Sequence, residues 1–538
     1  MNKKTVCFRD VAKKEDKPLA CLNAQNLIPL DALKETPSLQ PPPDKWLETY
    51  DFSLDGFSNF DRPKPNTAQE REKFVQGFIT GMKKLLDSQS NWTFFKALKL
   101  SMDYCMNCQT CSEACHVYLS SGKQEIYRPT FRSEVFRRIY RKLFTPSGKW
   151  LGSLAGADID LNFQTVWRLL EMSYRCNICR RCATVCPVGI DNSLIAREIR
   201  KLFSQELGVA PAELLNKGTR KHLETGSSTG MTPAGFKSSI EFIEEIIEEK
   251  TGRKIKVPVD KKGADILLIH NAGEFISWPE NPAAFSILFD AAGIDYTLSS
   301  DLVGYDAVKY GVWFDDIELA RVALQHIEIA KKLAVKKIVV AECGHAHKAI
   351  CVTADRVMPG ERTLSDMPRE SCLSLMHDIV KSGVIRLDPS RNDFHVTLHD
   401  PCNVTRMMGI VRPQREIIRH VCKRPLQEMI PHGVENYCCG GGGGFAVMDT
   451  LNFSEWRNNI PARMKIKQCI DVFQDILDPD IRKYVIAPCS NCKGALRDAI
   501  NNYHLKDDLG IHYTGLADVI VNAMVDLPEP YLEWDPEF

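Results

Sequence analysis

The chain has 538 residues, which is too long for one ordinary hydrophobic core, so we expect three or more domains. Its 69 basic and 69 acidic residues balance, which argues against a nucleic-acid-binding protein and against an acidic disordered tail. The sequence contains neither a signal peptide nor a run of about 18 apolar residues, so we expect a cytoplasmic chain without a transmembrane segment.

The chain contains twenty cysteines, and in a reducing compartment that number indicates metal ligation or redox chemistry rather than a disulfide framework. The first 95 residues, with the proline-rich stretch PSLQPPPDKWLETYDF, are predicted to form an extended arm that binds partner subunits. A disordered tail is the alternative for this segment.

Two cysteine runs of identical spacing, C-x2-C-x2-C-x3-C, follow the arm. Their members are Cys105, Cys108, Cys111 and Cys115, then Cys176, Cys179, Cys182 and Cys186. This spacing is typical of ferredoxins with two [4Fe-4S] clusters, in which the fourth cysteine of each run binds the other cluster. We therefore expect one cluster on Cys105, Cys108, Cys111 and Cys186, and another on Cys176, Cys179, Cys182 and Cys115. Zinc is disfavoured because its ligands fall in CxxC pairs.

Residues 96–205 are predicted to form a helical module around these runs, because FFKALKLSMDY and TVWRLLEMSYR read as helices. The insert between the runs contains RPTFRSEVFRRIYRKLF at 128–144, whose apolar residues recur every four positions and whose other sides are basic. We favour a solvated face for its cations over a surface for anionic lipid or an acidic partner. His116 stands where the second run has Pro187.

From about residue 264 the pattern changes to alternating strands and helices, after a helical linker at 206–262. We predict strands at KGADILLIHNA, IDYTLSS and KKIVVAECG. The helices predicted between them are NPAAFSILFDAAG and DIELARVALQHIEIAKKLAV. FHVTLHDPCNV begins a second pass, which ends with KYVIAPCSNCKGALRDAI. Such alternation predicts parallel α/β units. We place the first repeat at 263–390 and the second at 391–538.

The two repeats carry different side chains at matching positions. Asn271 lies where the second repeat has Cys402, Cys343 lies opposite Cys489, and His345 lies close to Cys492. The first repeat also lacks the cysteine pair of the second, because AVKYGVW stands in its place. We therefore expect only the second repeat to hold a metal group. The facing surface of the first repeat is expected to form one wall of an open substrate cleft.

The second repeat contains a set of five cysteines that follow predicted strands, namely Cys402, Cys438, Cys439, Cys489 and Cys492. Ligands of open α/β sheets gather at the carboxyl ends of strands, so these thiols should meet. Five thiolates exceed the four that a cubane takes. The glycines of YCCGGGGGF permit unusual backbone angles, and we expect their N–H groups to face cluster sulfides. A phosphate loop is disfavoured because no Lys-Ser/Thr follows the glycines.

The pattern C…CCG…CxxC resembles the CCG domain of heterodisulfide reductases and glycolate oxidase iron–sulfur subunits. With a helical dicluster module ahead of two CCG repeats, residues 95–530 resemble the HdrD family of membrane-bound heterodisulfide reductases. The resemblance is strongest to DsrK-type subunits of the DsrMKJOP complexes of sulfate reducers, with their HmeD-like archaeal relatives. The resemblance implies two [4Fe-4S] cubanes and one noncubane [4Fe-4S] cluster, the latter on the five cysteines of the second repeat.

The resemblance also implies a route for electrons and a set of partners. A DsrM-like haem-b membrane subunit would oxidise menaquinol, and electrons would pass through both cubanes to the noncubane cluster. That cluster would reductively cleave a disulfide or trisulfide on a DsrC-like carrier, which makes the five cysteines the catalytic set. The chain would be peripheral on the inner face of the membrane. The iron–sulfur subunit of a 2-hydroxy-acid dehydrogenase and a non-catalytic electron relay remain as alternatives.

Several further residues are candidates of lower rank. His345, His399 and His432 have side chains that titrate near neutral pH and could donate protons, although structural roles are favoured for them. Cys343 keeps a ligand-like position in the first repeat. The other cysteines lack ligand spacing and are predicted to be small core or surface residues, namely Cys7, Cys21, Cys351, Cys372, Cys422 and Cys469.

Overall fold

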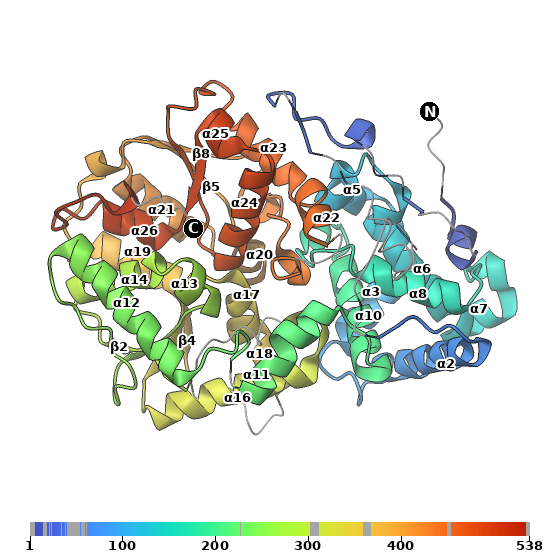
Figure 1. Ribbon diagram of the computed structural model, residues 1–538. Helices are drawn as coiled ribbons and strands as arrows, with labels where there is room; N and C mark the ends of the chain where they lie inside the picture. The colour runs from blue at the N-terminus through green and yellow to red at the C-terminus, as the bar shows by residue number, and fades with distance from the viewer. Residues whose placement is uncertain are drawn as a thin grey trace. The chain divides into compact units, whose positions relative to one another are not determined.

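The computed structural model describes most of the chain (Figure 1). The described residues are 6–13, 19–20, 22, 24–33, 35–37, 39, 54, 60, 62–225, 227–301, 311–358, 367–448 and 453–533. Cys21, most of the proline-rich stretch at 37–52 and the beginning of AVKYGVW therefore lie outside the described residues. Within the described ranges, no helix is both long and apolar enough to cross a membrane.

The chain divides into two compact units, and each is built from separate stretches of sequence. The first unit comprises Met1–Leu215, Trp313–Asp315 and Gly440–Lys465. The second comprises Asn216–Val312, Asp316–Cys439 and Ile466–Phe538. The chain thus passes from the second unit into the first between Cys439 and Gly440, inside the cysteine–glycine motif.

The first unit is helical. Its helices are α2 (Ala68–Leu85), α3 (Phe95–Asp103), α4 (Thr110–Glu113), α5 (His116–Ser120), α6 (Pro129–Phe144), α7 (Pro146–Leu151), α8 (Phe163–Ser173), α9 (Arg181–Thr184), α10 (Asn192–Leu207) and α22 (Phe453–Asn459). The helix α10 begins where the Asp191 carboxylate accepts from two backbone N–H groups, and it ends at Gly208 with φ of +63°. It packs against α2, α6 and α8 in the interior of this unit. The helices α3 and α8 lie where the sequence predicts them.

The helix α6 differs from its prediction in part, because Arg132 and Arg137 are buried rather than solvated, whereas Arg138 and Arg141 are half-buried and Lys142 is exposed. Arg137 is fully buried and donates from Nε to the backbone oxygen of Ser101 and from Nη2 to Asn192 Oδ1. Arg132 is also buried and donates to the Arg175 backbone oxygen. Neither a solvated cationic face nor a lipid-binding face exists at these positions. The arginines act inside the unit, where buried guanidinium groups need hydrogen-bond acceptors.

Short segments of the first 95 residues pack on the same unit. The 3-10 helix η1 (Phe8–Ala12) offers two backbone oxygens to Arg168 Nη1 of α8, at 2.6 and 2.9 Å. Phe8 stacks on Phe131 of α6 with ring centroids 4.6 Å apart. Farther along, Arg463 Nε donates to the backbone oxygen of Ile28 over 2.7 Å. These contacts attach the beginning of the chain to the helical unit.

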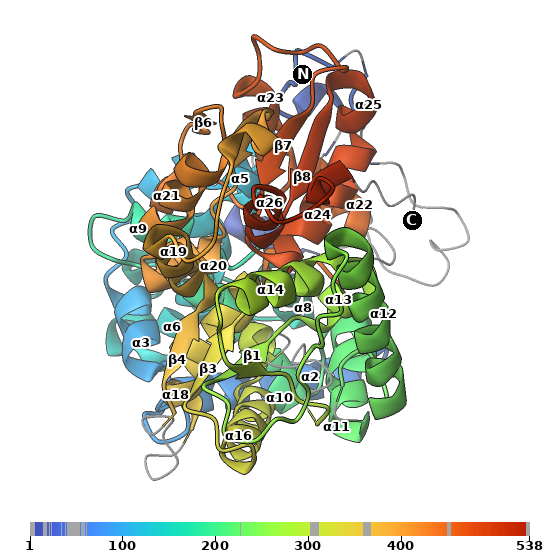
Figure 2. The same cartoon turned by 90° about the vertical axis from the view of Figure 1, so that its left-hand side faces the viewer.

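The second unit contains two parallel sheets (Figure 2). The first has the order β2-β1-β3-β4, with β1 (Ile266–Ile269), β2 (Tyr296–Thr297), β3 (Lys337–Val340) and β4 (Arg369–Ser371). The second has the order β6-β5-β7-β8, with β5 (His395–Leu398), β6 (Leu426–Gln427), β7 (Lys483–Ile486) and β8 (Ile511–Thr514). The central strands pair in matching registers, with Ile269 beside Val340 and Leu398 beside Ile486.

Helices connect and cover these strands. They are α11 (Lys221–Thr225), α12 (Pro233–Thr251), α13 (Ala272–Ser277), α14 (Glu280–Ala291), α16 (Asp316–Lys332), α17 (Gly344–Ala346), α18 (Ala354–Val357), α19 (Cys372–Ser382), α20 (Cys402–Met408), α21 (Arg412–Val421), α23 (Arg463–Asp471, whose residues up to Lys465 belong to the first unit), α24 (Ser490–Asn502), α25 (Leu505–Leu509) and α26 (Leu516–Asn522). In this unit α14 packs on α26 and α19 packs on α21 (Figure 2). One apolar core includes Leu268 and Val339 of the first sheet together with Val396 and Ile486 of the second. The mixed architecture of helical module and parallel sheets agrees with the predicted fold class.

Candidate functional site

The two ferredoxin-type runs adopt the same unusual backbone conformation. Asn107 and Ile178, each two residues after the first cysteine of a run, have φ of 55° and 50°. Gln109 and Arg180, each after the second cysteine, have φ of 68° and 62°. A β-branched residue such as Ile178 is strained in the left-handed region, so the surrounding structure must impose this turn. Both runs therefore share one turn geometry, and residues other than glycine occupy its left-handed positions.

Four cysteine side chains from both runs line one cavity in the first unit. They are Cys115, Cys176, Cys179 and Cys182. Cys115 comes from the first run, where it precedes α5, and the other three come from the second run. This is the set that the crossed-ligand hypothesis assigns to one cluster. Burial raises the pKa of Cys182 well above its ordinary value, and the charges of Asp191 and Cys176 add to that shift.

The remaining four motif cysteines lie within electrostatic reach of one another. Burial raises the pKa of Cys111 to about 12, and the nearby charges of Cys105, Cys115, Cys186 and Cys108 add to the shift. Cys186, from the second run, therefore lies within electrostatic reach of the first trio. Cys108 is exposed, and a hydrogen bond with the Thr110 hydroxyl lowers its pKa. The two groups together contain each of the eight cysteines of the runs.

Buried arginines surround these thiols with positive charge. Burial raises the pKa of the Cys115 thiol overall, although the Arg132 charge acts to lower it. Burial lowers the pKa of Arg137, whereas the charge of Cys105 opposes that shift. Thiolates and the cluster that they would hold are anionic, and such guanidinium groups stabilise negative charge in a site of low dielectric. The electrostatics of the unit therefore suit an anionic group at these cysteines.

Asn177, which follows Cys176, connects three segments of the first unit. Its Nδ2 donates to the backbone oxygens of Gly440 (2.6 Å) and Gly442 (3.2 Å). Its Oδ1 lies 2.9 Å from Nε2 of His116, the residue after Cys115. His116, which replaces the usual proline, thus has a hydrogen-bonding role that the sequence pattern does not show. The glycine run beyond Cys439 is tied directly to the turn that carries Cys176.

The glycines are needed for close approach to that turn. Gly443 has φ of +68°, and a Cβ on it would lie 2.9 Å from the Cys176 backbone oxygen. A Cβ on Gly442 would clash with the Asn177 backbone oxygen. Arg200 Nη1 donates to the Gly443 oxygen over 2.8 Å. The sequence predicts glycine N–H groups that face cluster sulfides, whereas the observed contacts are made by glycine carbonyls with Asn177 and Arg200.

In the second unit, three of the five CCG cysteines follow strands of the second sheet. Cys402 begins α20 after β5, and Cys489 precedes the first residue of α24 after β7, with Cys492 in the first turn of that helix. Cys438 and Cys439 follow the 3-10 helix η10 (Gly433–Glu435). The parallel pairing of β5 and β7 brings their carboxyl ends to the same edge of the sheet.

The five thiols meet and interact with one another. Hydrogen bonds from the thiols of Cys438 and Cys492 lower the pKa of Cys439 to about 5. A hydrogen bond to Cys438, together with burial, raises the pKa of Cys402. Burial opposes the shift at Cys489, but hydrogen bonds from Cys492 and the Gly344 N–H lower its pKa. All five side chains are buried, with exposed fractions from 1% to 9%. The arrangement is a compact sulfur cluster that includes stabilised thiolates.

His399 also reaches this group. Its ring nitrogen lies within 4.8 Å of the sulfurs of Cys439 and Cys492. His399 follows β5, and its backbone N–H donates to the Ile486 backbone oxygen over 2.8 Å. Of the three candidate histidines, His345 contacts Asn491 beside the ligands, whereas His432 faces the Met429 backbone oxygen at 3.2 Å. His399 is therefore the histidine placed against the sulfurs.

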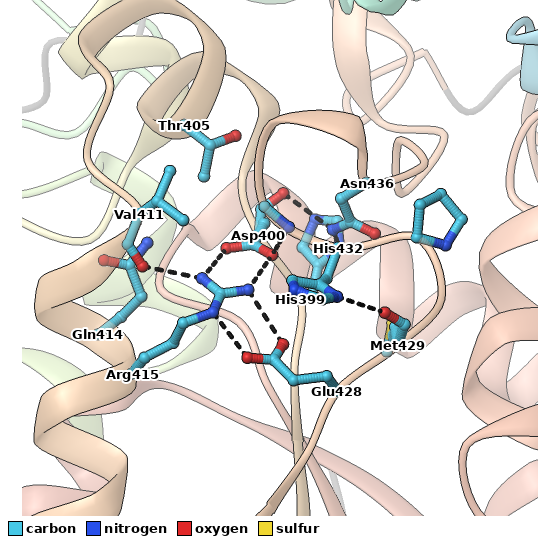
Figure 3. A network of polar contacts seen from close by, with 12 residues as sticks. His399, Asp400, Thr405, Val411, Gln414, Arg415, Glu428, Met429, His432 and Asn436 are labelled. Carbon is cyan, nitrogen blue, oxygen red and sulfur yellow. Dashed lines mark hydrogen bonds and ion pairs between the residues drawn. The ribbon is translucent and has the colours of Figure 1, made fainter.

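A charged network holds the loops that carry the cysteines (Figure 3). Arg415 of α21 donates through both terminal nitrogens to Asp400, at 2.8 and 2.7 Å, and through Nε to Glu428, at 2.7 Å. Asp400 also accepts from the Gly433 N–H at 2.6 Å, and its backbone oxygen accepts from Asn436 Nδ2 at 3.2 Å. Asp400 and Asn436 each lie two residues before a ligand candidate, Cys402 and Cys438 respectively. Sequence reasoning missed this network, which fixes both loops together.

The first repeat is in contact with the cysteine loops and does not leave an open cleft there. Gly344 N–H donates to Cys489 Sγ over 3.2 Å, and a Cβ on Gly344 would lie 3.3 Å from that sulfur. Asn271 Nδ2 donates to Ser490 Oγ over 2.6 Å. The expectation of a free facing surface is wrong at these positions, because polar groups of the first repeat bind the Cys489–Cys492 turn. At these positions the first repeat acts as a hydrogen-bonding support for the second.

The remaining cysteines differ in exposure. Cys343 is fully buried, and its sulfur lies 3.6 Å from Asn271 Nδ2. Cys372, Cys422 and Cys469 are buried among apolar residues, Cys351 is half-buried, and Cys7 is exposed. Burial raises the pKa of Cys351 to about 11. These environments are those of ordinary core or surface thiols.

The donor sets fit iron–sulfur groups. Thiolate sulfurs are the ligands that such groups take, and each of the three sulfur clusters is lined by four or five cysteines. N–H groups and guanidinium groups around them supply the surroundings that anionic metal–sulfur centres need. We assign candidate ligands accordingly: Cys105, Cys108, Cys111 and Cys186; Cys176, Cys179, Cys182 and Cys115; and Cys402, Cys438, Cys439, Cys489 and Cys492.

Comparisons with known proteins identify both regions. Residues 101–190 match the 4Fe-4S dicluster domain family, and residues 396–497 match the cysteine-rich domain family of the CCG type. A similar protein is the "Hdr-like menaquinol oxidoreductase iron-sulfur subunit 2" of Archaeoglobus fulgidus, 27% identical over 499 residues and 84% of each chain. The corresponding iron–sulfur subunit of Archaeoglobus profundus is 26% identical over 80% of each chain.

More distant similarity extends to methanogens. The HdrD-type component of the dihydromethanophenazine:CoB–CoM heterodisulfide reductase of Methanosarcina acetivorans is 24% identical over 434 residues, which are 78% of this chain and 93% of that one. The chain is therefore similar over most of its length to iron–sulfur subunits of heterodisulfide-reductase-like oxidoreductases. These similarities indicate an iron–sulfur oxidoreductase that takes part in electron transfer.

Proposed function

We propose that the chain is the catalytic iron–sulfur subunit of a membrane-associated complex that uses electrons from menaquinol to cleave a disulfide or trisulfide. The electrons would arrive through a haem-b subunit of the DsrM type, and the sulfur substrate would be carried by a small protein of the DsrC type. The names of the Archaeoglobus relatives support menaquinol as the electron donor, and the name of the Methanosarcina relative supports a disulfide as the substrate. In this proposal the chain corresponds to a DsrK-type subunit.

The observation that carries the proposal is the convergence of five buried thiols in the second repeat. Four thiolates are sufficient for an ordinary cubane, so a fifth indicates a different, noncubane group. When bound, such iron–sulfur groups supply one-electron transfers, and cleavage of one S–S bond requires two electrons. The protein residues hold the group, exclude water from it and place His399 beside the sulfurs of Cys439 and Cys492.

The glycine run beyond the cysteine pair is held within the first unit. Asn177, which follows Cys176, is hydrogen-bonded to Gly440, and Gly440 follows Cys439 directly in the chain. In this proposal, electrons pass from the dicluster module to the five-cysteine site.

The test uses anaerobically purified protein with its iron intact. It is reduced with dithionite and mixed with a DsrC-type carrier bearing a trisulfide, and released thiols are counted. We expect thiol release by the wild type and none by Cys439→Ala, with the dicluster signals unchanged in that variant. Thiol release by Cys439→Ala at the wild-type rate would place the chemistry elsewhere and leave the five-cysteine site as a relay.

A further inference from the structure

A buried cluster of acidic side chains lies beside the five-cysteine site, within the second unit. Four carboxylates surround one lysine, and together they raise the pKa of that lysine although burial acts against the charge. The members are Glu274 of α13, Glu280 at the start of α14, Glu342 after β3, Asp518 of α26 and Lys493 of α24. Both repeats contribute, because α13, α14 and β3 belong to the first and α24 and α26 to the second.

Two of the carboxylates are held firmly by protein donors. Glu342 Oε1 accepts from the backbone N–H groups of Leu516 and Ala517, each at 2.9 Å, at the start of α26. Asn281 Nδ2 donates to both Glu342 (3.3 Å) and Asp518 (3.1 Å), which bridges the two acids. These contacts fix the position of the cluster between the repeats.

Other polar atoms of the cluster have no hydrogen-bond partner within the part of the chain that the structure describes. They are Glu274 Oε1, Glu280 Oε2, Lys493 Nζ and Asn281 Oδ1. Leaving such groups unsatisfied in the interior costs about 1–3 kcal/mol each, so bound water is their physical explanation. A group of water molecules among carboxylates is a medium that carries protons.

The charge of the cluster favours protonated acids. Four ionised carboxylates against one lysine would leave three uncompensated negative charges in the interior. Burial raises the pKa of both Glu280 and Glu342 to about 8, and the charge of Asp518 contributes to both shifts. Other titratable groups that face them include His270, which lies 3.1 Å from Glu274, the Cys372 thiol of α19, and the hydroxyls of Tyr513 and Tyr531. Arg497 of α24 stacks on Trp278 at the same edge.

The cluster is hydrogen-bonded to the cysteine loop. Glu280 is half-buried as a residue, although its Oε2 atom is buried, whereas Glu274 and Glu342 are fully buried. Glu274 Oε2 accepts from the Asn271 N–H at 3.2 Å, and Asn271 Nδ2 donates to the Ser490 hydroxyl at 2.6 Å. Ser490 lies between the ligand candidates Cys489 and Cys492. Polar groups thus connect the acid cluster with the turn that carries two of the five thiols.

We propose that Glu280, Glu342 and Glu274, with bound water, form the route by which protons reach the five-cysteine site. The proposal rests on the proposed function. Cleavage of RS–SR′ breaks one S–S bond, takes up two electrons from the quinol-linked donor and two protons, and yields RSH and R′SH. Electrons arrive through metal groups, but protons need titratable side chains. These residues transfer protons and do not touch the reacting sulfurs, so they are proton-supply residues rather than catalytic ones.

The experiment compares Glu280→Gln and Glu342→Gln with the exposed control Asp378→Asn in the iron-loaded protein. Dithionite should reduce the iron–sulfur groups of every variant at the wild-type rate. With the trisulfide carrier, wild-type turnover should fall as the pH rises through about 8, because the acids lose their protons. Each glutamine variant should be slower by about tenfold or more at pH 7 and lack this fall. Glu280→Asp should recover part of the rate.

Two readouts need no substrate. Infrared spectra of the wild type at pH 7 should show a protonated carboxylic acid band that weakens in each glutamine variant and not in Asp378→Asn. The midpoint potential of the five-cysteine site should depend on pH in the wild type and lose that dependence in Glu342→Gln. An unchanged band together with an unchanged pH dependence would overturn the proton route. Absence of trisulfide cleavage by the wild type would overturn the proposed function alone.

Discussion

The two α/β repeats have the same strand order and differ in the residues at the ends of their strands. In the first, the loop after β1 carries Asn271 and the loop after β3 carries Cys343. In the second, the equivalent loops carry Cys402 and Cys489. Cys343 and Cys489 both occupy the position just before a helix. The same backbone thus provides a metal-ligand position in one repeat and a hydrogen-bonding position in the other.

In the proposed function, side-chain identity and not the fold decides which repeat would hold the metal group. The first repeat has retained its polar loops, but these now support the second repeat through Gly344 and Asn271. It also supplies Glu274, Glu280 and Glu342 to the buried acid cluster. A repeat without ligands has therefore kept a role in positioning and in proton supply. The following predictions test this division between the repeats.

The largest difference is expected between two cysteines at equivalent positions. Cys489→Ala should lose the metal of the five-cysteine site, because it removes a thiolate that the Gly344 N–H and Cys492 stabilise. Cys343→Ala should keep the iron content of the wild type. Iron analysis of the two variants, purified side by side without oxygen, measures this. Equal iron loss in both would mean that the first repeat also holds metal.

The next variant separates the helical unit from both repeats. Cys179→Ala should remove the cluster assigned to Cys115, Cys176, Cys179 and Cys182, which amounts to about four iron atoms. In the assembled complex, a quinol analogue should no longer reduce the five-cysteine site. The spectroscopic signal of that site should persist, since its ligands lie in the other unit. Quinol-driven turnover at the normal rate would show that electrons take another route.

The Arg415 network tests what positions the ligand loops of the second repeat. Arg415→Ala leaves Asp400 buried without its ion-pair partner, and breaking such a pair costs about 3–5 kcal/mol. We expect a lower unfolding temperature and a loss of iron from the five-cysteine site. Arg412→Ala on the same helix removes an exposed side chain and should change stability by at most about 1 kcal/mol. Similar behaviour of the two variants would contradict the positioning role.

The smallest effect is expected when the first repeat is made more like the second. Asn271→Cys places a thiol where Cys402 lies in the second repeat, beside Cys343, but the first repeat has no adjacent cysteine pair. Two thiolates are too few for an iron–sulfur cluster, so the iron content should stay unchanged. Loss of the bond to Ser490 should reduce stability by about 1 kcal/mol. Iron analysis and thermal unfolding check both outcomes; additional iron would contradict the comparison.

Much of the fold and of the candidate site follows from local sequence patterns. The central strands β1, β3, β5 and β7 are short apolar runs that precede ligand-like residues, and the structure has strands there. The thirteen motif cysteines are recognisable in the sequence because their spacing reflects local turns. The peripheral strand β2 lies within IDYTLSS, which the sequence predicts as a strand, whereas the two-residue strand β6 is defined by its pairing with β5.

Other features depend on contacts that no local pattern encodes. Asn177 binds Gly440, which lies 263 positions further along the chain. The close approach that requires the glycines therefore cannot be predicted from the residues that neighbour them in the sequence. The pattern of α6 predicts solvated cations because it does not show the acceptors on α3 and α10 that bind Arg137. The acid cluster joins five separate elements, and it becomes visible only after both repeats are folded together.

The central claim is that the second repeat holds a third iron–sulfur group on Cys402, Cys438, Cys439, Cys489 and Cys492. The most direct measurement is the metal content and Mössbauer spectrum of the anaerobically purified protein. The account predicts clearly more than about eight iron atoms per chain, with two cubane components and a third component of different type that disappears in Cys439→Ala. Iron sufficient for only two cubanes, or stoichiometric zinc at the five cysteines, would contradict it.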